Sequence, residues 1–436
     1  MILKLQEVRI MRKRVFFSLF LLLFVLASFS TVYAKTELVL WDANTEAEPE
    51  KQVIEDAIAR FEADNPEYTV RHVPISNDNY KTKLKVAMGA NNEPDIFMSW
   101  GGGPLEAYVN AGKVLDITDE LQKNNWIDRF VPAGMDVATF DGRTYGIPVA
   151  GMRAVLVWYR TDIFDKVGLE VPETYSEFKN IVKVLKENGY IPITLANKNK
   201  WTGSFIYMYV ADRLGGKEAF VKAALRKEGG AFNNESFVRA GEVIQELVDL
   251  GAFPPGVNGL DEDQGQSRQL IYADRAAMYV MGDWAYSVFS DENPAMLDNV
   301  DYFPFPVFEE GKGDPTNLVG SPGGNYYSVS KSSLNKEAAV EFLKYLSDER
   351  TAKSMVEIGN LAPFSGIEKY LEDPMLKRVY KTIQNANYVQ LYYDQYLPPQ
   401  VAEAHKDTMQ GLFGKTMTPE EVANKFEAAA EKYFAE

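Results

Sequence analysis

The sequence predicts an α/β protein built of two lobes, and three observations lead to this fold class. Its 436 residues, 46% hydrophobic and 25% charged, are enough for two or more compact units. Strand and helix patterns alternate in the order βαβαβ between residues 37 and 100, which is typical of a parallel sheet covered by helices. A similar alternation starts again after residue 148, so we expect a second α/β lobe.

Hydrophobic spacing predicts alternating strands and helices in the first lobe. The apolar residues that recur at helical spacing after the first strand stop at Pro66, and the glycines Gly101–Gly103 break the chain after the third strand. Pro104 suits the start of the helix that follows, and Gly112 suits its end. The expected strands are 37–41, 68–73 and 94–100, and the expected helices are 53–61, 79–87 and 104–112.

Turn and capping signals organise the second lobe. Thr174 and Glu177 form a capping-box pattern at the start of a helix that Gly189 ends. The same pattern at Thr418 and Glu421 begins the last helix. The expected landmarks are a strand at 154–159, a Pro- and Gly-rich interruption at 303–325 and a final amphipathic helix at 418–433.

The composition excludes several classes of chemistry. The chain has no cysteine, which excludes disulfides, thiolate nucleophiles and cysteine-ligated metal sites. His72 and His405 are its two histidines, so a Ser–His pair would have to use one of them and a multi-histidine metal centre is excluded. The net charge of −16 repels a phosphate backbone, so we expect no nucleic acid partner. We also expect no metal and no cofactor.

The N-terminal segment indicates export. Basic residues at 12–14 precede an apolar run over 15–29, and the small-residue site Val32-Tyr33-Ala34 follows, which is the order of a secretory signal peptide. We expect cleavage after Ala34, and because residues 1–34 carry a net charge of +4, the mature chain would carry −20. No cysteine follows the apolar run, so we expect no lipid anchor there. The periplasm is the expected location, and free secretion is the alternative.

A search for catalytic motifs gives mostly negative results. The chain contains no G-x-S-x-G, G-x-x-x-x-G-K, H-E-x-x-H or G-x-G-x-x-G pattern. The acidic run 261–263 lacks the spacing of a calcium-binding loop, and we interpret it as a solvated face. A carboxylate pair for glycoside hydrolysis is defined by its separation in space, so an exported glycosidase stays an alternative. Otherwise we expect a protein that is not an enzyme.

Aromatic residues, 13% of the chain, provide the positive signal. Ligands of open α/β sheets bind beyond the carboxyl ends of the strands, where Trp41 and Trp100 stand in this sequence. A sugar ring has apolar faces and a polar rim, so a saccharide site combines flat rings with carboxylates and amides. We interpret Trp126 and Trp158 as structural and leave Trp41 unassigned. The candidate site residues are Asn44, Glu46, Trp100, Gly101, Trp201, Asp283, Trp284, Asn325, Tyr326 and Asp394.

Six sequence blocks follow one another along the chain. They are Pro94–Trp100, Leu105–Gly112, Tyr145–Pro148, Trp158–Asp162, Ala276–Trp284 and Phe342–Ser347. In this order they resemble the extracellular solute-binding proteins, family 1, which are the sugar-capturing subunits of ABC importers. No single block is diagnostic, but together they extend the resemblance from about Glu37 to the C-terminus.

The resemblance implies the two-lobed periplasmic-binding-protein fold, with a ligand cleft between the lobes. It implies a hinge that the chain crosses near Pro148, near Phe305 and near Ala362. The implied first lobe consists of residues 35–148 and 305–361, and the implied second lobe consists of residues 149–304 and 362–436.

The resemblance also implies the roles of the cleft residues and the partners. Trp100 would line the first lobe, Trp284 would stack on a sugar from the second, and the segments around Trp201 and Asp394 would flank the cleft. The expected partners are a saccharide and the permease subunits of an ABC importer, with the chain itself a monomer. A peptide or polyamine is the alternative ligand, because acids such as Asp283 and Asp394 could pair with an ammonium group.

Overall fold

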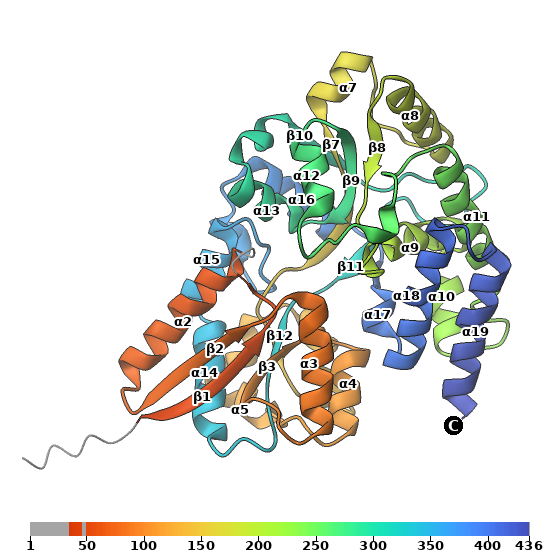
Figure 1. Ribbon diagram of the computed structural model, residues 1–436. Coiled ribbons are helices and arrows are strands. Elements are labelled where there is room, and N and C mark those ends of the chain that lie inside the picture. Colours follow the sequence, from red (N-terminus) through yellow and green to blue (C-terminus); the bar gives the residue numbers. More distant parts are fainter. Residues whose placement is uncertain (1–34, 46–48, 436) are drawn as a thin grey trace, which may run out of the picture.

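The computed structural model of the protein describes residues 35–45 and 49–435, which form two lobes, each built on a sheet with helices packed against it (Figure 1). The lobe that contains β1 and α2 lies at the bottom of Figure 1, and the lobe that contains β7 and β9 lies above it. The expected signal segment and Glu46 fall outside the described residues. The predicted two-lobed α/β fold is confirmed.

A five-stranded sheet, in the order β2-β1-β3-β12-β6, forms the centre of the first lobe. β1 pairs in parallel with β2 and β3, as the βαβαβ pattern predicts, whereas β12 is antiparallel to both β3 and β6. The strand bounds are β1 (Thr36–Asp42), β2 (Tyr68–Pro74), β3 (Ile96–Ser99), β6 (Ile147–Pro148) and β12 (Tyr326–Val329), and β4 (Thr139–Phe140) pairs separately with β5 (Arg143–Thr144).

The helices of the first lobe turn their apolar faces to this sheet and to one another. α2 buries the apolar residues that recur at helical spacing from Val53 to Phe61, and the ring of Phe342 in α14 lies 5.4 Å from that of Phe61. The helix bounds are α2 (Glu50–Asp64), α3 (Asn77–Gly89), α4 (Gly103–Asn110), α5 (Thr118–Gln122), η1 (Lys123–Arg129), α6 (Pro132–Asp136), α14 (Lys336–Leu346), α15 (Glu349–Glu357) and η4 (Ile367–Tyr370).

A six-stranded sheet forms the centre of the second lobe, in the order β13-β11-β7-β9-β8, with β10 also paired to β7. β7 is antiparallel to β9, β10 and β11, while β8 is parallel to β9 and β13 is parallel to β11. The bounds are β7 (Arg153–Arg160), β8 (Ile191–Thr194), β9 (Ala276–Gly282), β10 (Val300–Phe303), β11 (Leu318–Ser321) and β13 (Val389–Leu391).

The capping boxes predicted for two helices of the second lobe are confirmed. The side chain of Thr174 accepts from the N–H of Glu177, whose carboxylate accepts from the N–H of Thr174 in return. Thr418 and Glu421 make the same reciprocal pair. The helix bounds are α7 (Thr161–Val167), α8 (Tyr175–Glu187), α9 (Trp201–Gly215), α10 (Lys217–Ala224), α11 (Glu235–Asp249), η2 (Val257–Gly259), α12 (Gln266–Tyr272), α13 (Ala285–Glu292), η3 (Pro294–Asn299), α16 (Pro374–Gln384), α17 (Tyr393–Tyr396), α18 (Pro399–Phe413) and α19 (Pro419–Ala435).

The interior of the lobes contains many of the aromatic side chains. Trp158 is fully buried against Tyr302, with ring centres 5.6 Å apart. Trp126 is 2% exposed, and its Nε1 donates to Oγ of Ser347 at 2.9 Å. Both tryptophans therefore have the structural role predicted for them.

Within the described ranges, no helix is both long enough and apolar enough to cross a membrane.

The chain passes between the sheets at places that differ in part from those expected. The first crossing joins β6 to β7 just after Pro148. The second lies at residues 322–325, between β11 and β12, and not near Phe305. The reason is that the guanidinium group of Arg213 binds the carbonyl oxygens of Phe305 and Asn317, which keeps this Pro- and Gly-rich segment on the second lobe.

The third crossing also lies later in the sequence than the expected position near Ala362. The carbonyl oxygen of Pro363 accepts from the N–H of Val131 at 2.9 Å, and η4 packs against α15, so this segment stays on the first lobe. Asp373 then accepts from the hydroxyl of Tyr286 in α13 at 2.6 Å. The chain therefore reaches the second lobe only between η4 and α16.

Candidate functional site

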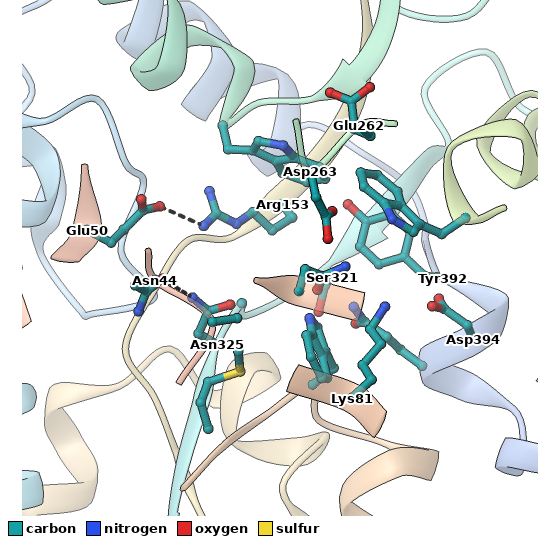
Figure 2. Close-up of a pocket in the computed structure, with 18 of the residues that line it drawn as sticks. Asn44, Glu50, Lys81, Arg153, Glu262, Asp263, Ser321, Asn325, Tyr392 and Asp394 are labelled. Carbon is teal, nitrogen blue, oxygen red and sulfur yellow. Dashed lines mark hydrogen bonds and ion pairs between the residues drawn. The ribbon is translucent and has the colours of Figure 1, made fainter. Parts of the chain in front are cut away.

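A cavity of about 200 Å³ lies between the two lobes, and residues of both lobes line it (Figure 2). The first lobe contributes the segments that follow β1 and β3 together with parts of α2 and α3, and the second contributes β7, α9 and the segment that follows β9. The lining residues are Ala43, Asn44, Glu50, Asn77, Lys81, Met98, Trp100, Arg153, Trp201, Phe205, Glu262, Asp263, Arg268, Trp284, Val288, Ser321, Gly324, Asn325, Tyr392, Asp394 and Gln395.

Two strand ends of the first lobe place an amide and an indole in the cleft. Asn44 follows β1, where its backbone N–H and its Nδ2 donate to the buried Asp42 at 3.1 and 3.0 Å. Nδ2 of Asn325, from the second crossing, donates to Oδ1 of Asn44 at 3.2 Å (Figure 2). Trp100 follows β3, and the ammonium group of Lys81 lies 4.8 Å from the centre of its ring. The sheet edge therefore holds both side chains in fixed positions.

Aromatic rings form a wall on the second lobe. Trp201 begins α9 and Trp284 follows β9, and their ring centres lie 6.4 Å apart. Phe205 completes the group, with its ring centre 5.4 Å from that of Trp201. A Cβ atom at Gly282 would lie 1.8 Å from the ring of Trp284, so this orientation of the indole requires glycine at that position.

An ion pair connects the lobes at the first crossing. Nη2 of Arg153, the first residue of β7, lies 3.4 Å from Oε1 of Glu50 in α2, and both side chains are less than one-tenth exposed. The guanidinium group also lies 5.4 Å from the ring of Trp284, and its Nη1 is 3.9 Å from Oδ2 of Asp283. Burial raises the pKa of Asp283 to about 6, although the charge of Arg153 opposes this shift.

Several buried polar atoms around the cleft have no hydrogen-bond partner among the described residues. They are Oε2 of Glu50, Nη1 of Arg153, Nε1 of Trp201 and the hydroxyl of Tyr392. An unpaired buried polar group costs about 1–3 kcal/mol. The set includes both donors and acceptors, which matches the capacity of a hydroxyl group to donate and to accept.

The interpretation of residues 261–263 as a solvated face is wrong for two of the three residues. Glu262 and Asp263 both line the cleft. Glu262 is 5% exposed and accepts from the hydroxyl of Tyr279 at 2.6 Å, and burial raises its pKa against the opposing charge of Arg268. Burial likewise raises the pKa of Asp263 to about 6. Glu262 is therefore buried within its own lobe, and Asp263 contacts the first lobe through the N–H of Asp78.

The structure brings together most of the residues predicted for the site. Asp283 is buried directly behind the lining, and its Oδ1 accepts from the N–H of Ala154 at 2.9 Å. Gly101 is buried beside Tyr326. The prediction that Tyr326 contacts the ligand does not agree with its position. Its side chain is 1% exposed, and its hydroxyl donates to the carbonyl of Gly134 inside the first lobe. Glu46 lies outside the described residues. The candidates in the lining are Asn44, Trp100, Trp201, Trp284, Asn325 and Asp394.

The sequence reasoning misses several residues of the lining. Arg153 and Glu50 meet only because the lobes fold together, and no local pattern announces an ion pair 103 residues apart in the chain. Lys81 lies on an amphipathic helix whose other lysines are exposed, so its sequence context gives no signal. Tyr392 stands in the same aromatic segment as the predicted Asp394, and this neighbourhood is the one signal that could have identified it.

The Ser–His contact in the described part of the chain lies inside the second lobe. Oγ of Ser204 lies 2.7 Å from Nε2 of His405, and both residues are buried, with the imidazole packed 4.7 Å from the ring of Phe426. Nδ1 of His405 has no hydrogen-bond partner among the described residues, and burial lowers its pKa to about 3. The arrangement therefore lacks the orienting acid and the accessible base of a nucleophilic site.

Across residues 35–45 and 49–435, no group of histidine and acidic side chains has the geometry to hold a metal ion.

The sequence of this two-lobed chain also matches a known protein family. Residues 43–353 match the family described as bacterial extracellular solute-binding protein, and this match covers more than half of the chain. The chain belongs to this family. The predicted resemblance is confirmed, and the solute-binding fold accounts for the cleft between the lobes.

Among curated relatives of this solute-binding protein, the melibiose/raffinose/stachyose-binding protein MelE of Bacillus subtilis is 22% identical over 400 residues, which covers 90% of this chain and 88% of MelE. An ABC transporter extracellular-binding protein of Pyrococcus horikoshii is 26% identical over 59% of this chain and 58% of its own length. A probable sugar-binding periplasmic protein of Mesorhizobium japonicum is 26% identical over 50% of this chain and 52% of its own. The match thus spans little more than half the length of the last two relatives.

Solved structures similar to this solute-binding protein cover nearly all of its chain. A chitin oligosaccharide binding protein superposes with a TM-score of 0.85 and 25% identity, covering 92% of this chain and all of the other. A protein studied for xylan utilization by the thermophilic bacterium Caldanaerobius polysaccharolyticus superposes with a TM-score of 0.84 and 32% identity, covering 90% of this chain and 99% of the other. The two-lobed architecture is therefore shared over the whole fold.

Proposed function

We propose that the protein binds a saccharide in the cleft between its lobes and delivers it to the permease of an ABC-type importer. The observation that carries this proposal is the placement of Trp100 on one lobe and Trp201 and Trp284 on the other, around one cavity. Each face of a sugar ring is apolar and stacks on a flat aromatic ring. Rings from both lobes can therefore hold a ligand that contacts both at once.

The polar groups of the cleft suit the hydroxyl rim of a sugar. A hydroxyl both donates and accepts, so it can bond to Oε2 of Glu50 and to Nη1 of Arg153, which lack partners among the described residues. Hydrogen bonds to charged groups contribute more than those between neutral groups, about 1.5–3 kcal/mol each. Several such bonds and the stacked rings are sufficient for micromolar binding, which corresponds to about −8 kcal/mol.

The charge of the cleft supports a neutral ligand over a polyamine or a cationic peptide. Three cationic side chains in the lining, Lys81, Arg153 and Arg268, nearly balance its acids. Oε1 of Glu262 already forms an ion pair with Nη1 of Arg268 at 3.2 Å, and Oε1 of Glu50 forms one with Nη2 of Arg153 at 3.4 Å. Because these carboxylates have cationic partners within the protein, a cationic ligand would gain little from them.

The relatives support the same ligand class. MelE is named for binding melibiose, raffinose and stachyose, the Mesorhizobium relative is called sugar-binding, and the structure with the highest TM-score quoted above is called a chitin oligosaccharide binding protein. A ligand that touches both lobes binds the closed form more tightly, so it favours closure by that difference in affinity. The closed form would then dock on the permease as an exported monomer in the periplasm.

Calorimetric titration of the purified chain, without residues 1–34, with a panel of mono- and oligosaccharides tests the proposal. We expect at least one sugar to bind with micromolar or tighter affinity, while spermidine and a lysine-rich peptide do not bind. Chromatography of the same mixtures after long incubation should recover the sugar unchanged. Tight binding of spermidine or the peptide would contradict the proposal, and so would the appearance of sugar fragments, which would indicate a glycosidase.

A further inference from the structure

A group of contacts between the lobes lies beside the cleft and involves two residues that do not line it. Asp78 lies in the first turn of α3 on the first lobe, and Asn199 precedes α9 on the second. Nδ2 of Asn199 donates to Oδ2 of Asp78 at 2.7 Å. The backbone N–H of Asp78 donates to Oδ2 of Asp263, again on the second lobe, at 3.1 Å. Two hydrogen bonds therefore join the lobes at one point.

Each side of this contact is fixed within its own lobe. Oδ1 of Asn199 accepts from the backbone N–H of Glu262 at 2.7 Å, so the amide is oriented before it meets Asp78. The N–H of Asp78 is one of the donors at the start of α3 that the helix itself cannot satisfy. A carboxylate near a helix N-terminus is favoured by the helix dipole, and here Asp263 supplies it from the opposite lobe. The start of α3 is thus capped only when the lobes are together.

We propose that Asp78, Asn199 and Asp263 form an interlobe latch that sets the ligand affinity of the cleft by stabilising its closed form. The latch rests on the proposed function, because it presupposes a ligand that binds the closed form. The apparent dissociation constant equals the intrinsic constant divided by the fraction of protein in the competent form. Contacts that raise the closed fraction therefore tighten binding, even when, like the bond between Asp78 and Asn199, they join residues that do not line the cleft.

Such a latch has a property that distinguishes it from a residue that contacts the ligand. Because neither Asp78 nor Asn199 lines the cavity, the loss of their bond lowers the closed fraction by the same amount for every ligand. All affinities then fall by a common factor, and the order of preference among sugars stays the same. A lining residue such as Trp201 instead touches different parts of different sugars, so its loss changes their ratio.

The test compares variants on both sides of the Asp78–Asn199 bond. We expect Asp78→Ala to weaken the binding of every saccharide by the same factor, roughly 10-fold or more, because the lost hydrogen bond has a carboxylate acceptor. Asn199→Asp keeps the acceptor for Glu262 but places a carboxylate against Asp78, so it should weaken binding further. In the double variant Asp78→Asn with Asn199→Asp the donor and acceptor are exchanged, and binding should recover toward the wild-type affinity.

Lys198→Ala is the matched control, because it removes a neighbouring contact inside the second lobe, between Nζ of Lys198 and Asp261 at 2.7 Å. We expect it to leave all affinities unchanged. Urea denaturation of each variant checks that the lobes stay folded. The latch is overturned if Asp78→Ala leaves every affinity unchanged, or if it changes the ratio between sugars.

Small-angle X-ray scattering of the ligand-free protein separates this inference from the proposed function. We expect the Asp78→Ala variant to have a larger radius of gyration than the wild type, since the lobes open more often. If no saccharide binds but this expansion is seen, the proposed function is wrong, and only the part of the inference that the Asp78–Asn199 contact holds the lobes together is correct. If saccharides bind the wild type and neither the radius nor the affinity changes in the variant, the function stands and the latch is wrong.

Discussion

Arg153 and Glu50 come from different lobes and face each other in the wall of the cleft, with Nη2 of the arginine 3.4 Å from Oε1 of the glutamate. The same Oε1 accepts from Nδ2 of Asn360 at 2.6 Å, and Oδ1 of Asn360 accepts from the N–H of Gly151 at 2.9 Å. The N–H of Gly324 meanwhile donates to the carbonyl of Ala150 at 2.7 Å. The first two crossings and the segment before the third are thus tied together around one buried ion pair.

Removal of the acid should therefore destabilise the protein. Glu50→Ala leaves Arg153 buried with only the more distant Asp283, and breaking a buried pair in this way costs about 3–5 kcal/mol. Glu50→Gln keeps an acceptor for Asn360 and should cost less than the alanine variant. Urea denaturation measures the free energy of unfolding of both. An alanine variant as stable as the wild type would show that the ion pair between Glu50 and Arg153 does not stabilise the segments that connect the lobes.

Trp284→Ala should weaken saccharide binding strongly. The indole lies in the aromatic wall of the cleft, and loss of a central buried ring from a binding site costs about 2 kcal/mol, or roughly thirty-fold in affinity. Trp41→Ala is the matched control. Nζ of Lys83 lies 4.3 Å from the centre of the Trp41 ring, and Trp41 is not among the residues that line the cleft. Calorimetry with the best sugar of the panel compares them. Equal losses in both variants would contradict the assignment of the wall to the ligand.

His72 should stabilise the first lobe at low pH more than at high pH. Its Nε2 lies 2.9 Å from Asp42 and its Nδ1 lies 2.7 Å from Glu55, so only the imidazolium offers a proton to both carboxylates. Burial lowers the pKa of His72, but the two carboxylates outweigh burial and raise it above 6.5. The stability is therefore fully present below pH 6.5, the unfolded value, and is lost as pH rises through the folded pKa.

Two variants test this dependence. His72→Gln should lower the free energy of unfolding at pH 6, and the difference from the wild type should shrink at pH 9. Glu55→Gln removes one of the two groups that raise the pKa, so NMR titration of the His72 ring should give a lower midpoint than in the wild type. A midpoint that does not move would show that Glu55 does not act on the imidazole.

His405 should have the opposite effect on stability. Burial lowers its pKa to about 3, whereas the unfolded chain takes up this proton near pH 6.5. Stability is therefore present above pH 6.5 and is lost as pH falls toward 3, by a total on the order of 4–5 kcal/mol. The double variant Ser204→Ala with His405→Phe removes the titrating ring together with its partner. Its acid denaturation should be shallower than that of the wild type, and an identical acid limb would refute the role of His405.

Local patterns in the sequence were sufficient to predict β1, β2, β3 and β7, both capping boxes, and the position of three tryptophans beside the cleft, whose contact with a ligand stays a prediction. Trp100 follows a buried strand, and Trp201 and Trp284 stand in polar, loop-like surroundings. The prediction that Tyr326 faces the cleft failed because of its place in a strand. It is the first residue of β12, and because successive side chains of a strand point to opposite faces, it turns into the lobe while Asn325 faces the cleft.

Contacts between distant segments could not be predicted in this way. The acidic residues Glu262 and Asp263 have the composition of an exposed run, but Tyr279 and Arg268 of the same lobe bond to Glu262, and the start of α3 on the other lobe contacts Asp263. The crossing expected near Phe305 lies later in the chain. Arg213 donates hydrogen bonds to the carbonyl oxygens of Phe305 and Asn317, and these bonds keep the Pro- and Gly-rich segment on the second lobe. Both errors come from burial created by tertiary contacts, which the local sequence does not encode.

The position of β12 between β3 and β6 has a consequence for the order in which the chain can assemble. A ribosome synthesises residues 36–148 first, but the sheet of this lobe has a gap until residues 326–329 appear, after nearly all of the strands of the other lobe. The N-terminal segment therefore cannot complete its core while the chain is still short. The edges of β3 and β6 that face each other stay unpaired until β12 has been synthesised, which delays the completion of this lobe until most strands of the other lobe exist.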